Sequence, residues 1–324
     1  MKVLVTGGAG YVGSHTVLGL VEAGHQVTVL DDLSTGRREL VHGARLVLGD
    51  IGDPAALEAA LESQGPFDAA MHFAARTQVG ESMADPGRYF ATNVAGTLQL
   101  LRALVARGVR WFVFSSSAAV YGEPRQTPIP EEHPLAPTNP YGESKRMVEA
   151  MLGWFERAHG LRWVSLRYFN AAGADPRGRT GECHEPETHL IPSVLLAALG
   201  RREAVEIYGD DWPTPDGTCI RDFVHVCDLA EAHRLALEYL ARGGASAAFN
   251  LGSGRGWSVR QVVETCRRVT GRSFPVRIGP RRPGDPAVLV ASNERARAQL
   301  GWRPRYDSLE VMVETAWAWH RKGY

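Results

Sequence analysis

Short apolar runs alternate with segments of helical periodicity through the first half of the chain. The apolar runs are KVLVT (2–6), QVTVL (26–30), RLVLGD (45–50), DAAMHF (68–73), WFVFSS (111–116) and WVSLRYF (163–169). They are apolar almost throughout instead of alternating with polar residues, which is typical of strands covered on both faces of a parallel sheet. We therefore expect them to be strands of one parallel sheet.

Helical patterns fill the gaps between these runs. One spans 12–23 and stops at Gly24, and a second follows the N-cap sequence at 53–54. Another spans 88–107, and a fourth spans 140–160. This alternation of strands and helices predicts an α/β fold with a doubly wound parallel sheet, that is, a Rossmann domain.

The character of the sequence changes after residue 170. The segment 173–189 is rich in Gly, Pro and charge and has no period, so we expect a loop. Helical patterns then begin near residues 190, 228, 258 and 308, and a strand is expected near 248–251. We predict a Rossmann domain over 1–170, joined by returning segments near 222–255. A smaller α/β domain over 171–324 should lie at the carboxyl edge of the sheet, where ligands of such sheets bind.

Composition narrows the classes of function. The 324 residues include 36 basic and 36 acidic side chains, so the net charge is zero and nucleic acid is not an expected partner. No apolar run reaches membrane-spanning length, and the N-terminus enters a strand instead of a signal peptide, so we expect a cytoplasmic protein. The four cysteines show no CxxC spacing and are expected to be free thiols. A zinc site from Cys183, His184 and His189 is an alternative that we do not favour, and we predict no metal.

A glycine-rich turn follows the first predicted strand. Gly7, Gly10 and Gly13 stand three residues apart where that strand passes into the first helix. Glycine allows a tight turn and a close approach to a diphosphate, and the helix N-terminus supplies amide donors and the positive end of a dipole. Asp31 ends the second strand and can accept a hydrogen bond from an adenosine ribose hydroxyl. This favours NAD, although Arg37 and Arg38 leave NADP open.

Two further strand ends can contribute to the same site. Asp50 and Ile51 follow the third strand and can receive the adenine edge. The small residues of HFAA, residues 72–75, end the fourth strand and let a dinucleotide lie close.

A serine cluster and a Tyr–Lys pair carry the candidate chemistry. Ser115, Ser116 and Ser117 end the fifth strand, and Tyr141 and Lys145 stand four residues apart on one face of the predicted helix at 140–160. A nearby ammonium and the charge of an oxidised nicotinamide favour the phenolate and lower the tyrosine pKa. Together with Ser117, this group could take a proton from a substrate alcohol while a hydride leaves for nicotinamide.

The sequence resembles the extended short-chain dehydrogenase/reductase family and, more narrowly, the UDP-glucose 4-epimerases. The resemblance rests on TGGAGYVGSH (6–15), Asp31, FSSSAAVYG (114–122) and YGESK (141–145), and continues through LRYFNAAGA (166–174) and IRDFVHVCDLA (220–230). It implies a homodimeric isomerase that interconverts UDP-galactose and UDP-glucose through a 4-keto sugar, with transient hydride transfer to tightly bound NAD. Tyr141 would act as the base, Ser117 would orient or relay, and Lys145 would hold the nicotinamide ribose.

The resemblance also implies the binding residues. The cofactor set is Gly7, Gly10, Tyr11, Val12, Gly13, Asp31, Asp32, Asp50, Ile51, Phe73, Ala74, Ala75, Asn93, Ser115, Tyr141, Lys145 and Tyr168. The substrate set is Ser117, Tyr141, Asn170, His189, Leu190, Tyr208, Arg221, Arg282 and Asp285.

Several alternatives stay open. His189 stands where many members have Asn, and Leu289 occupies a position thought to govern access of an N-acetyl group. UDP-N-acetylglucosamine or another UDP-sugar, such as a pentose or uronate, is therefore an alternative substrate. A dehydrogenase that releases NADH and a non-catalytic NAD sensor are further alternatives. Sugar-nucleotide 4,6-dehydratases are disfavoured, because the serine cluster has no acidic pair.

Overall fold

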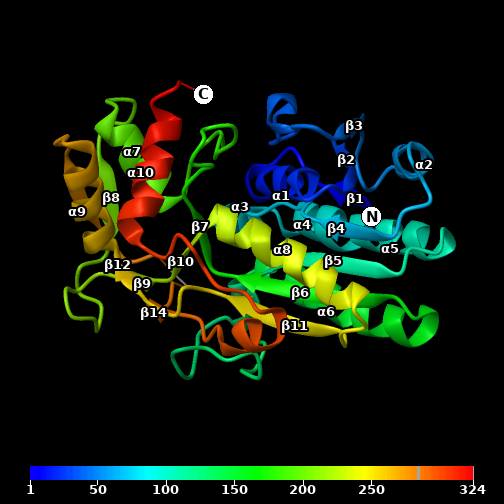
Figure 1. Cartoon of the computed structure of the whole chain (residues 1–324). Coiled ribbons are helices and arrows are strands. Elements are labelled where there is room, and N and C mark those ends of the chain that lie inside the picture. The colour runs from blue at the N-terminus through cyan, green and yellow to red at the C-terminus, as the bar shows by residue number, and fades with distance from the viewer. Residues whose placement is uncertain (283–284, 324) are drawn as a thin grey trace.

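The structure, a computed structural model, describes residues 1–282 and 285–323 and has two lobes (Figure 1). Within the described residues, seven parallel strands form the sheet of the larger lobe in the order β3-β2-β1-β4-β5-β6-β11. The order reverses between β1 and β4, so the carboxyl ends of the strands open a crevice there, where such sheets bind ligands. The predicted doubly wound α/β fold is confirmed. The strands are β1 (Lys2–Thr6), β2 (Gln26–Asp31), β3 (Arg45–Leu48), β4 (Ala69–His72), β5 (Trp111–Ser117), β6 (Arg162–Tyr168) and β11 (Ala247–Leu251).

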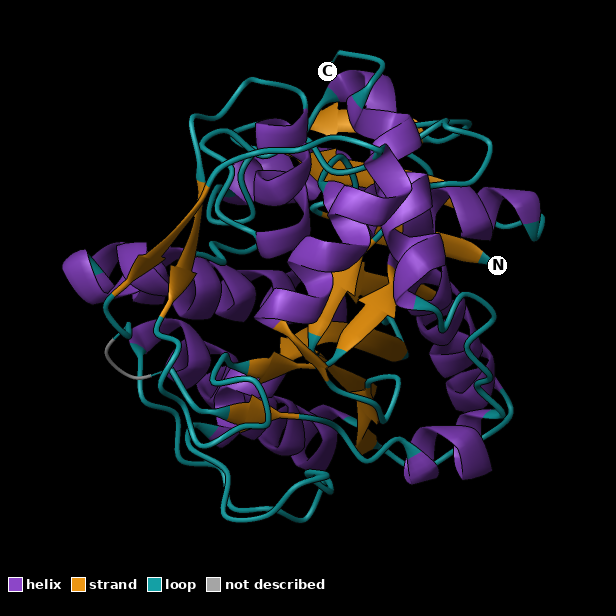
Figure 2. Cartoon of the chain, turned by 90° about the vertical axis from the view of Figure 1, so that its left-hand side faces the viewer, coloured by secondary structure: helices purple, strands orange, loops and turns teal. Residues whose placement is uncertain are grey.

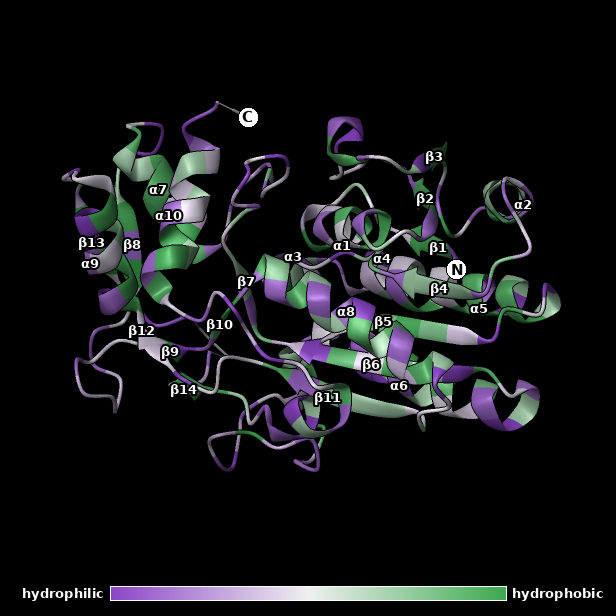
Figure 3. Cartoon of the chain, in the orientation of Figure 1, coloured by the Kyte–Doolittle hydropathy of each residue, from purple (hydrophilic) through white to green (hydrophobic). Residues whose placement is uncertain are grey.

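Helices cover both faces of this sheet (Figure 2). On one face α1 (Tyr11–Glu22) packs against α8 (Val226–Ala241), and on the other lie α2 (Pro54–Glu62), α5 (Thr97–Ala106) and α6 (Pro140–His159). Val3 and Val5 point into the first core and Leu4 into the second, and all three are fully buried. A strand buried on both sides favours apolar residues on both of its faces, which explains the unbroken apolar runs, such as the green stretch of β5 in Figure 3.

The smaller lobe has its own core between helices and short strands. Its helices α7 (Leu190–Ala198), α9 (Val259–Thr270) and α10 (Leu309–His320) bury Val194, Val262 and Val313 against β8 (Val205–Tyr208). The other short strands of the chain are β7 (Asn170–Ala172), β9 (Ile220–Arg221), β10 (Phe223–His225), β12 (Trp257–Ser258), β13 (Val276–Gly279) and β14 (Val288–Leu289). The shorter helical segments are η1 (Arg38–Leu40), α3 (Val79–Ala84), α4 (Pro86–Tyr89), η3 (Ala118–Tyr121) and η4 (Ala296–Leu300).

The chain returns to the larger lobe after entering the smaller one. The helix α8 covers the sheet beside α1, and β11 pairs in parallel with β6. The boundaries of the two predicted domains stay a prediction. Among the described residues, no helix has the length and apolar character needed to cross a bilayer.

The helix predicted over 88–107 is interrupted. The segment η2 (Phe90–Gly96) is π-helical and separates α4 from α5, so the prediction of one regular helix is wrong. The hydroxyl of Thr97 donates to the carbonyl of Asn93 at 2.6 Å and also lies 2.8 Å from His72 Nε2. This side-chain bond occupies a carbonyl that a regular helix would give to a backbone amide. Hydrophobic periodicity could not reveal it, because the pattern of apolar positions does not report a bond between a side-chain hydroxyl and a backbone carbonyl.

A buried ion pair joins α6 to the sheet. The Glu149 carboxylate accepts from Arg167 Nη2 at 2.6 Å and from Ser116 Oγ at 2.7 Å, and both charged side chains are 7% exposed. Arg167 Nη1 also donates to the Tyr121 hydroxyl at 2.9 Å. The pair therefore holds α6, β5, β6 and η3 in one arrangement.

Removing the negative charge of this pair should destabilise the protein strongly. We expect Glu149→Gln to lower the free energy of unfolding by about 3–5 kcal/mol, because it leaves the Arg167 guanidinium buried without its counter-charge. The control Glu310→Gln breaks the exposed pair with Arg268 and should cost at most about 1 kcal/mol. Urea denaturation of both variants measures the difference, and equal losses would contradict the assignment.

Candidate active site

The glycine-rich turn lies at the crevice between β1 and β4. Gly7 has φ of 74°, and a Cβ there would lie 2.4 Å from the backbone nitrogen of Ala74. A Cβ on Gly13 would lie 2.1 Å from the carbonyl oxygen of Gly7. Only glycine fits at these two positions, so the turn stays pressed against the end of β4 and against the start of α1.

The N-terminus of α1 is open in front of this turn. Gly10 is its N-cap residue, and a Cβ there would meet only the Gly7 carbonyl, at 3.5 Å. Without a capping side chain, the first amides of the helix can donate to a ligand, and the helix dipole favours an anion. This arrangement fits the diphosphate of a dinucleotide.

Asp31 closes the other side of the turn. Its carboxylate is 7% exposed and accepts from the backbone amides of Ala9 and Leu33, both at 2.9 Å. Burial raises the pKa of Asp31, while these hydrogen bonds pull it down. The exposed neighbour Asp32 is engaged by Ser34 at 2.7 Å. A carboxylate at the end of β2 suits a ribose hydroxyl and repels a phosphate at the same position.

The remaining predicted cofactor residues line the strand ends. Ile51 is buried beside Gly96, and Asp50 accepts from the Gly52 amide at 2.7 Å. The Phe73 ring lies 4.6 Å from that of His233.

The side chain of Asn93 makes hydrogen bonds within the protein. Its side chain accepts from the Arg76 amide at 2.8 Å and donates to the Arg76 carbonyl and to Ser144 Oγ, each at 3.0 Å. It therefore ties the loop after β4 to α6.

The reactive helix starts as predicted. The side chain of Asn139 accepts from the Gly142 amide at 2.9 Å, and Pro140 occupies the first turn of α6. Tyr141 and Lys145 then share one face of the helix, and the Lys145 ammonium lies 5.9 Å from the centre of the Tyr141 ring. Lys145 Nζ donates to the carbonyl of Ser115 at 2.9 Å, which fixes α6 against the end of β5.

Burial is the largest influence on the pKa values of the two reactive groups. Burial raises the pKa of Tyr141, and a hydrogen bond with Ser117 only partly opposes this. Burial also lowers the pKa of Lys145 to about 7, which Glu149 partly offsets. The expectation that Lys145 and an oxidised nicotinamide together lower the pKa of Tyr141 stays a prediction, because these directions describe the chain without its cofactor. The Lys145 ammonium is held at the Ser115 carbonyl and is itself disfavoured by burial.

Ser115 and Tyr168 complete this part of the site. Their hydroxyls lie 2.7 Å apart where β5 and β6 end. Burial, with a further contribution from Tyr141, raises the pKa of Tyr168.

Four of the predicted substrate residues meet in the smaller lobe. Arg221 Nη2 lies 3.7 Å from Asp285 Oδ2, and Arg282 Nε lies 3.4 Å from the same oxygen. The Arg282 guanidinium stacks over the Tyr208 ring at 4.3 Å. The structure thus brings four of these residues together, and two guanidinium groups beside an aromatic ring can hold a diphosphate and a base.

A buried aspartate supports this group and was missed by sequence reasoning. Asp222 is fully buried, and its side chain accepts from Ser253 Oγ at 2.7 Å and from the Ala291 amide at 3.1 Å. Its carbonyl accepts from Asn170 Nδ2 at 2.7 Å. Burial raises the pKa of Asp222 to about 6, although these hydrogen bonds oppose the shift. Its position next to Arg221 was the available signal, but its partners are distant in sequence.

His189 is the N-cap residue of α7, and Leu190 is its first residue. The His189 side chain is 47% exposed and its Nδ1 lies 2.9 Å from Glu182 and 3.0 Å from Glu187. Burial alone would lower the pKa of His189, but the two carboxylates outweigh it and raise the pKa to about 10. Leu289 pairs with Arg221 and packs beside Tyr121, so it stands between the two lobes.

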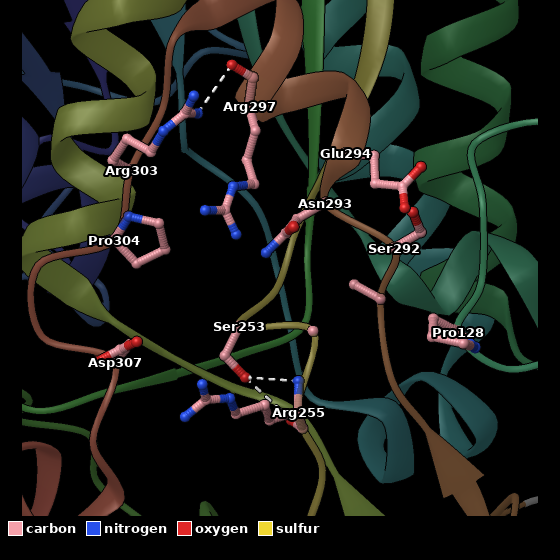
Figure 4. Close-up of a pocket in the computed structure, with 12 residues that line it drawn as sticks. Pro128, Ser253, Arg255, Ser292, Asn293, Glu294, Arg297, Arg303, Pro304 and Asp307 are labelled. Carbon is pink, nitrogen blue, oxygen red and sulfur yellow. Dashed lines mark hydrogen bonds between the residues drawn. The ribbon is translucent and has the colours of Figure 1, made fainter.

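A separate cavity of about 310 Å³ lies beside η4 (Figure 4). Its lining includes Arg255, Arg297 and Arg303 together with Ser253 and Asp307. None of the predicted site residues contributes to it, so it is distinct from the crevice described above.

Comparisons with known proteins agree with this geometry. A model of the NAD dependent epimerase/dehydratase family matches residues 3–252. The UDP-glucose 4-epimerase of Halalkalibacterium halodurans is 55% identical over 322 residues, which cover 99% of this chain and 96% of that protein. The crystal structure of UDP-glucose 4-epimerase from Brucella ovis in complex with NAD is 48% identical, with a TM-score of 0.95 over 98% of this chain and 97% of that one.

A further structure comes from Bifidobacterium longum. That UDP-glucose 4-epimerase, in complex with NAD⁺ and UDP, is 36% identical, with a TM-score of 0.94 over 100% of this chain and 99% of that one. The chain therefore belongs to the NAD-dependent epimerase/dehydratase family, among the UDP-glucose 4-epimerases.

Proposed function

We propose that this protein interconverts UDP-galactose and UDP-glucose, with Tyr141 as the proton-transfer group. The observation that carries the proposal is the arrangement of Ser117, Tyr141 and Lys145 at the carboxyl end of β5, on the same edge of the sheet as the open N-terminus of α1. The similar proteins solved with NAD and with UDP support both ligands.

Tyr141 and Ser117 handle the proton of the sugar 4-hydroxyl. The Tyr141 oxygen accepts this proton as C4 becomes a ketone and returns it when C4 is reduced again. When bound, NAD supplies a reversible hydride acceptor and a positive charge close to the phenol. Ser117 hydrogen-bonds the same phenol and relays or orients the proton. Inversion requires that the keto sugar present its opposite face before it is reduced.

The smaller lobe holds the nucleotide while the sugar turns. Arg221 and Arg282 provide planar donors for the diphosphate, and Tyr208 lies against the base. Asn170, His189 and Leu190 face the sugar from β7 and α7. Anchoring through the nucleotide leaves the hexose free to rotate, which is a condition for returning the hydride to either face.

Tyr141→Phe tests the assignment of the base. We expect NAD to stay bound while turnover falls by about 10²–10⁴-fold, because the variant keeps the ring and loses the proton-transfer oxygen. Purified protein is mixed with UDP-galactose without added cofactor, and the anomeric proton signals of UDP-glucose are followed by NMR. Tyr239→Phe, in α8, is the control and should keep its rate. A near-normal rate for Tyr141→Phe would contradict the assignment of the base. Release of NADH without formation of UDP-glucose would indicate a dehydrogenase.

Asp31→Asn tests the choice of cofactor. The variant removes the negative charge beside the ribose, so we expect weaker binding of NAD and weaker discrimination against NADP. The ratio of the two dissociation constants should fall at least about tenfold, since like-charge contacts of this kind are worth several kcal/mol. Fluorescence titration of refolded, cofactor-free protein measures both constants. An unchanged ratio would mean that Asp31 does not face the ribose.

We also propose a homodimer through α5 and α6. Leu98 and Met147 are each 37% exposed and Trp154 is 66% exposed on these adjacent helices, whereas Leu101 is fully buried against the sheet. A cavity of about 500 Å³ lies next to them and is lined by Val105 and Phe155 among others. Exposed apolar side chains grouped on two helices favour a self-associating surface. A cytoplasmic location stays a prediction.

The dimer has its own test. Light scattering at micromolar protein should give twice the mass of one chain, and the double variant Leu98→Asp/Met147→Asp should give the mass of one chain. Ile278→Asp, at an exposed position of β13 in the smaller lobe, is the matched control and should stay dimeric. Unmodified protein that has the mass of a single chain would contradict the proposal.

A further inference from the structure

Four side chains converge in the loop between β7 and α7. Glu182, His184, Glu187 and His189 each offer one donor atom, and these atoms all lie within 4.8 Å of one another. His184 Nδ1 lies 2.9 Å from Glu182 and 4.0 Å from Glu187. His189 Nδ1 lies 2.9 Å and 3.0 Å from the same two carboxylates.

These distances match a small tetrahedral metal site. Zinc binds imidazole nitrogen and carboxylate oxygen at about 2.0–2.2 Å, so tetrahedral ligand atoms lie about 3.3–3.6 Å apart. Three of the observed separations, at 2.9–3.0 Å, are those of imidazole–carboxylate hydrogen bonds, and the fourth is 4.0 Å, so the donor atoms lie close to this range and would shift slightly around an ion. Both imidazoles approach through the same nitrogen, and two imidazoles with two carboxylates form a donor set that suits zinc.

The two glutamate side chains of the cluster are buried and need a positive charge close to them. The side chains of Glu182 and Glu187 are each 5% exposed, and within residues 1–282 and 285–323 their ion-pair partners are only the two histidines. Two buried carboxylates close together repel each other unless a positive charge lies between them. In the metal-free chain the two histidines lie where they can supply that charge, and a divalent ion would take the place of their protons.

The backbone holds the ligands in place. The carbonyl of Glu182 accepts from Trp319 Nε1 at 2.9 Å, and the carbonyl of Glu187 accepts from Arg202 Nη2 at 2.7 Å. The ring of Tyr11, from the glycine-rich turn, meets the His184 ring edge-on at 6.4 Å. The cluster is therefore fixed by α10, by the residues after α7 and by the start of α1.

We propose that Glu182, His184, Glu187 and His189 bind one divalent transition-metal ion, with zinc the best match. Four protein ligands close the coordination shell, which is the pattern of structural zinc sites. The ion would fasten the 173–189 loop between the glycine-rich turn and the first residue of α7. The set differs from the alternative considered from sequence, because the two glutamates take the place of Cys183, whose thiol is not among the converging atoms.

Zinc binding to the intact protein tests this site. Protein carrying its cofactor is dialysed against a chelator, and Zn²⁺ is titrated in competition with a chromophoric chelator while elemental analysis gives the stoichiometry. We expect one ion per chain. His184→Ala and Glu187→Gln should each weaken binding by at least the 10–100-fold that loss of an outer-shell partner costs. Co²⁺ in place of Zn²⁺ should give the intense visible absorption of a tetrahedral site.

Glu185→Gln is the matched control. It makes the same chemical change two residues from Glu187, at an exposed position outside the cluster, and should bind as the unmodified protein does. Zn²⁺ should raise the melting temperature of the control and not that of His184→Ala, because a ligand that binds the folded state stabilises it. Circular dichroism checks that each variant is folded.

Three results would overturn the proposal. The first is that the unmodified protein binds no stoichiometric zinc, so that the cluster is only a set of carboxylate–imidazole pairs. The second is that His184→Ala and Glu187→Gln fold and bind zinc as tightly as the control Glu185→Gln. Loss of binding in Cys183→Ser, with retention in Glu187→Gln, would assign the ion to a thiol site instead.

Discussion

The site depends on the contact between α6 and the carboxyl end of β5. The Lys145 ammonium donates to the Ser115 carbonyl, and Glu149, one turn further along the helix, accepts from Ser116 and from the buried Arg167. These bonds fix the rotation of α6 about its axis. Because Tyr141 lies one turn before Lys145, the same bonds place its hydroxyl beside Ser117.

Burial has opposite effects on the two reactive groups. It raises the pKa of the Tyr141 phenol and lowers that of the Lys145 ammonium to about 7. The groups of the chain alone therefore make a weak base. A further positive charge close to the phenol is needed for proton transfer at neutral pH, so base strength and cofactor binding are coupled. This coupling suits an enzyme that holds its cofactor through the whole reaction.

The larger lobe carries the groups proposed for proton transfer, and the smaller lobe carries the arginines proposed to bind the substrate. The sheet edge supplies rigid positions for proton transfer, while the arginines of β9 and of the segment before β14 come from short strands supported by Asp222. The loop 173–189 connects the two parts, since Tyr11 donates to the Gly173 carbonyl at 2.5 Å and His189 is the N-cap residue of α7. A change in the conformation of this loop would therefore affect both the glycine-rich turn and the residues proposed to contact the sugar.

The sequence by itself determined the strands, most of the helices and the residues of the glycine-rich turn and the Tyr–Lys pair. Those features depend on local rules: continuous apolar runs, caps such as Asn139, and i to i+4 spacing. Only the tertiary structure decided the π-helical segment at Phe90–Gly96, the buried pair of Glu149 and Arg167, and the meeting of Glu182 with His189. Each depends on side-chain contacts that hydrophobic periodicity does not encode. The effect of burial on the pKa of Tyr141 also came only from the structure, because the cost of burying a charge depends on the whole surrounding fold.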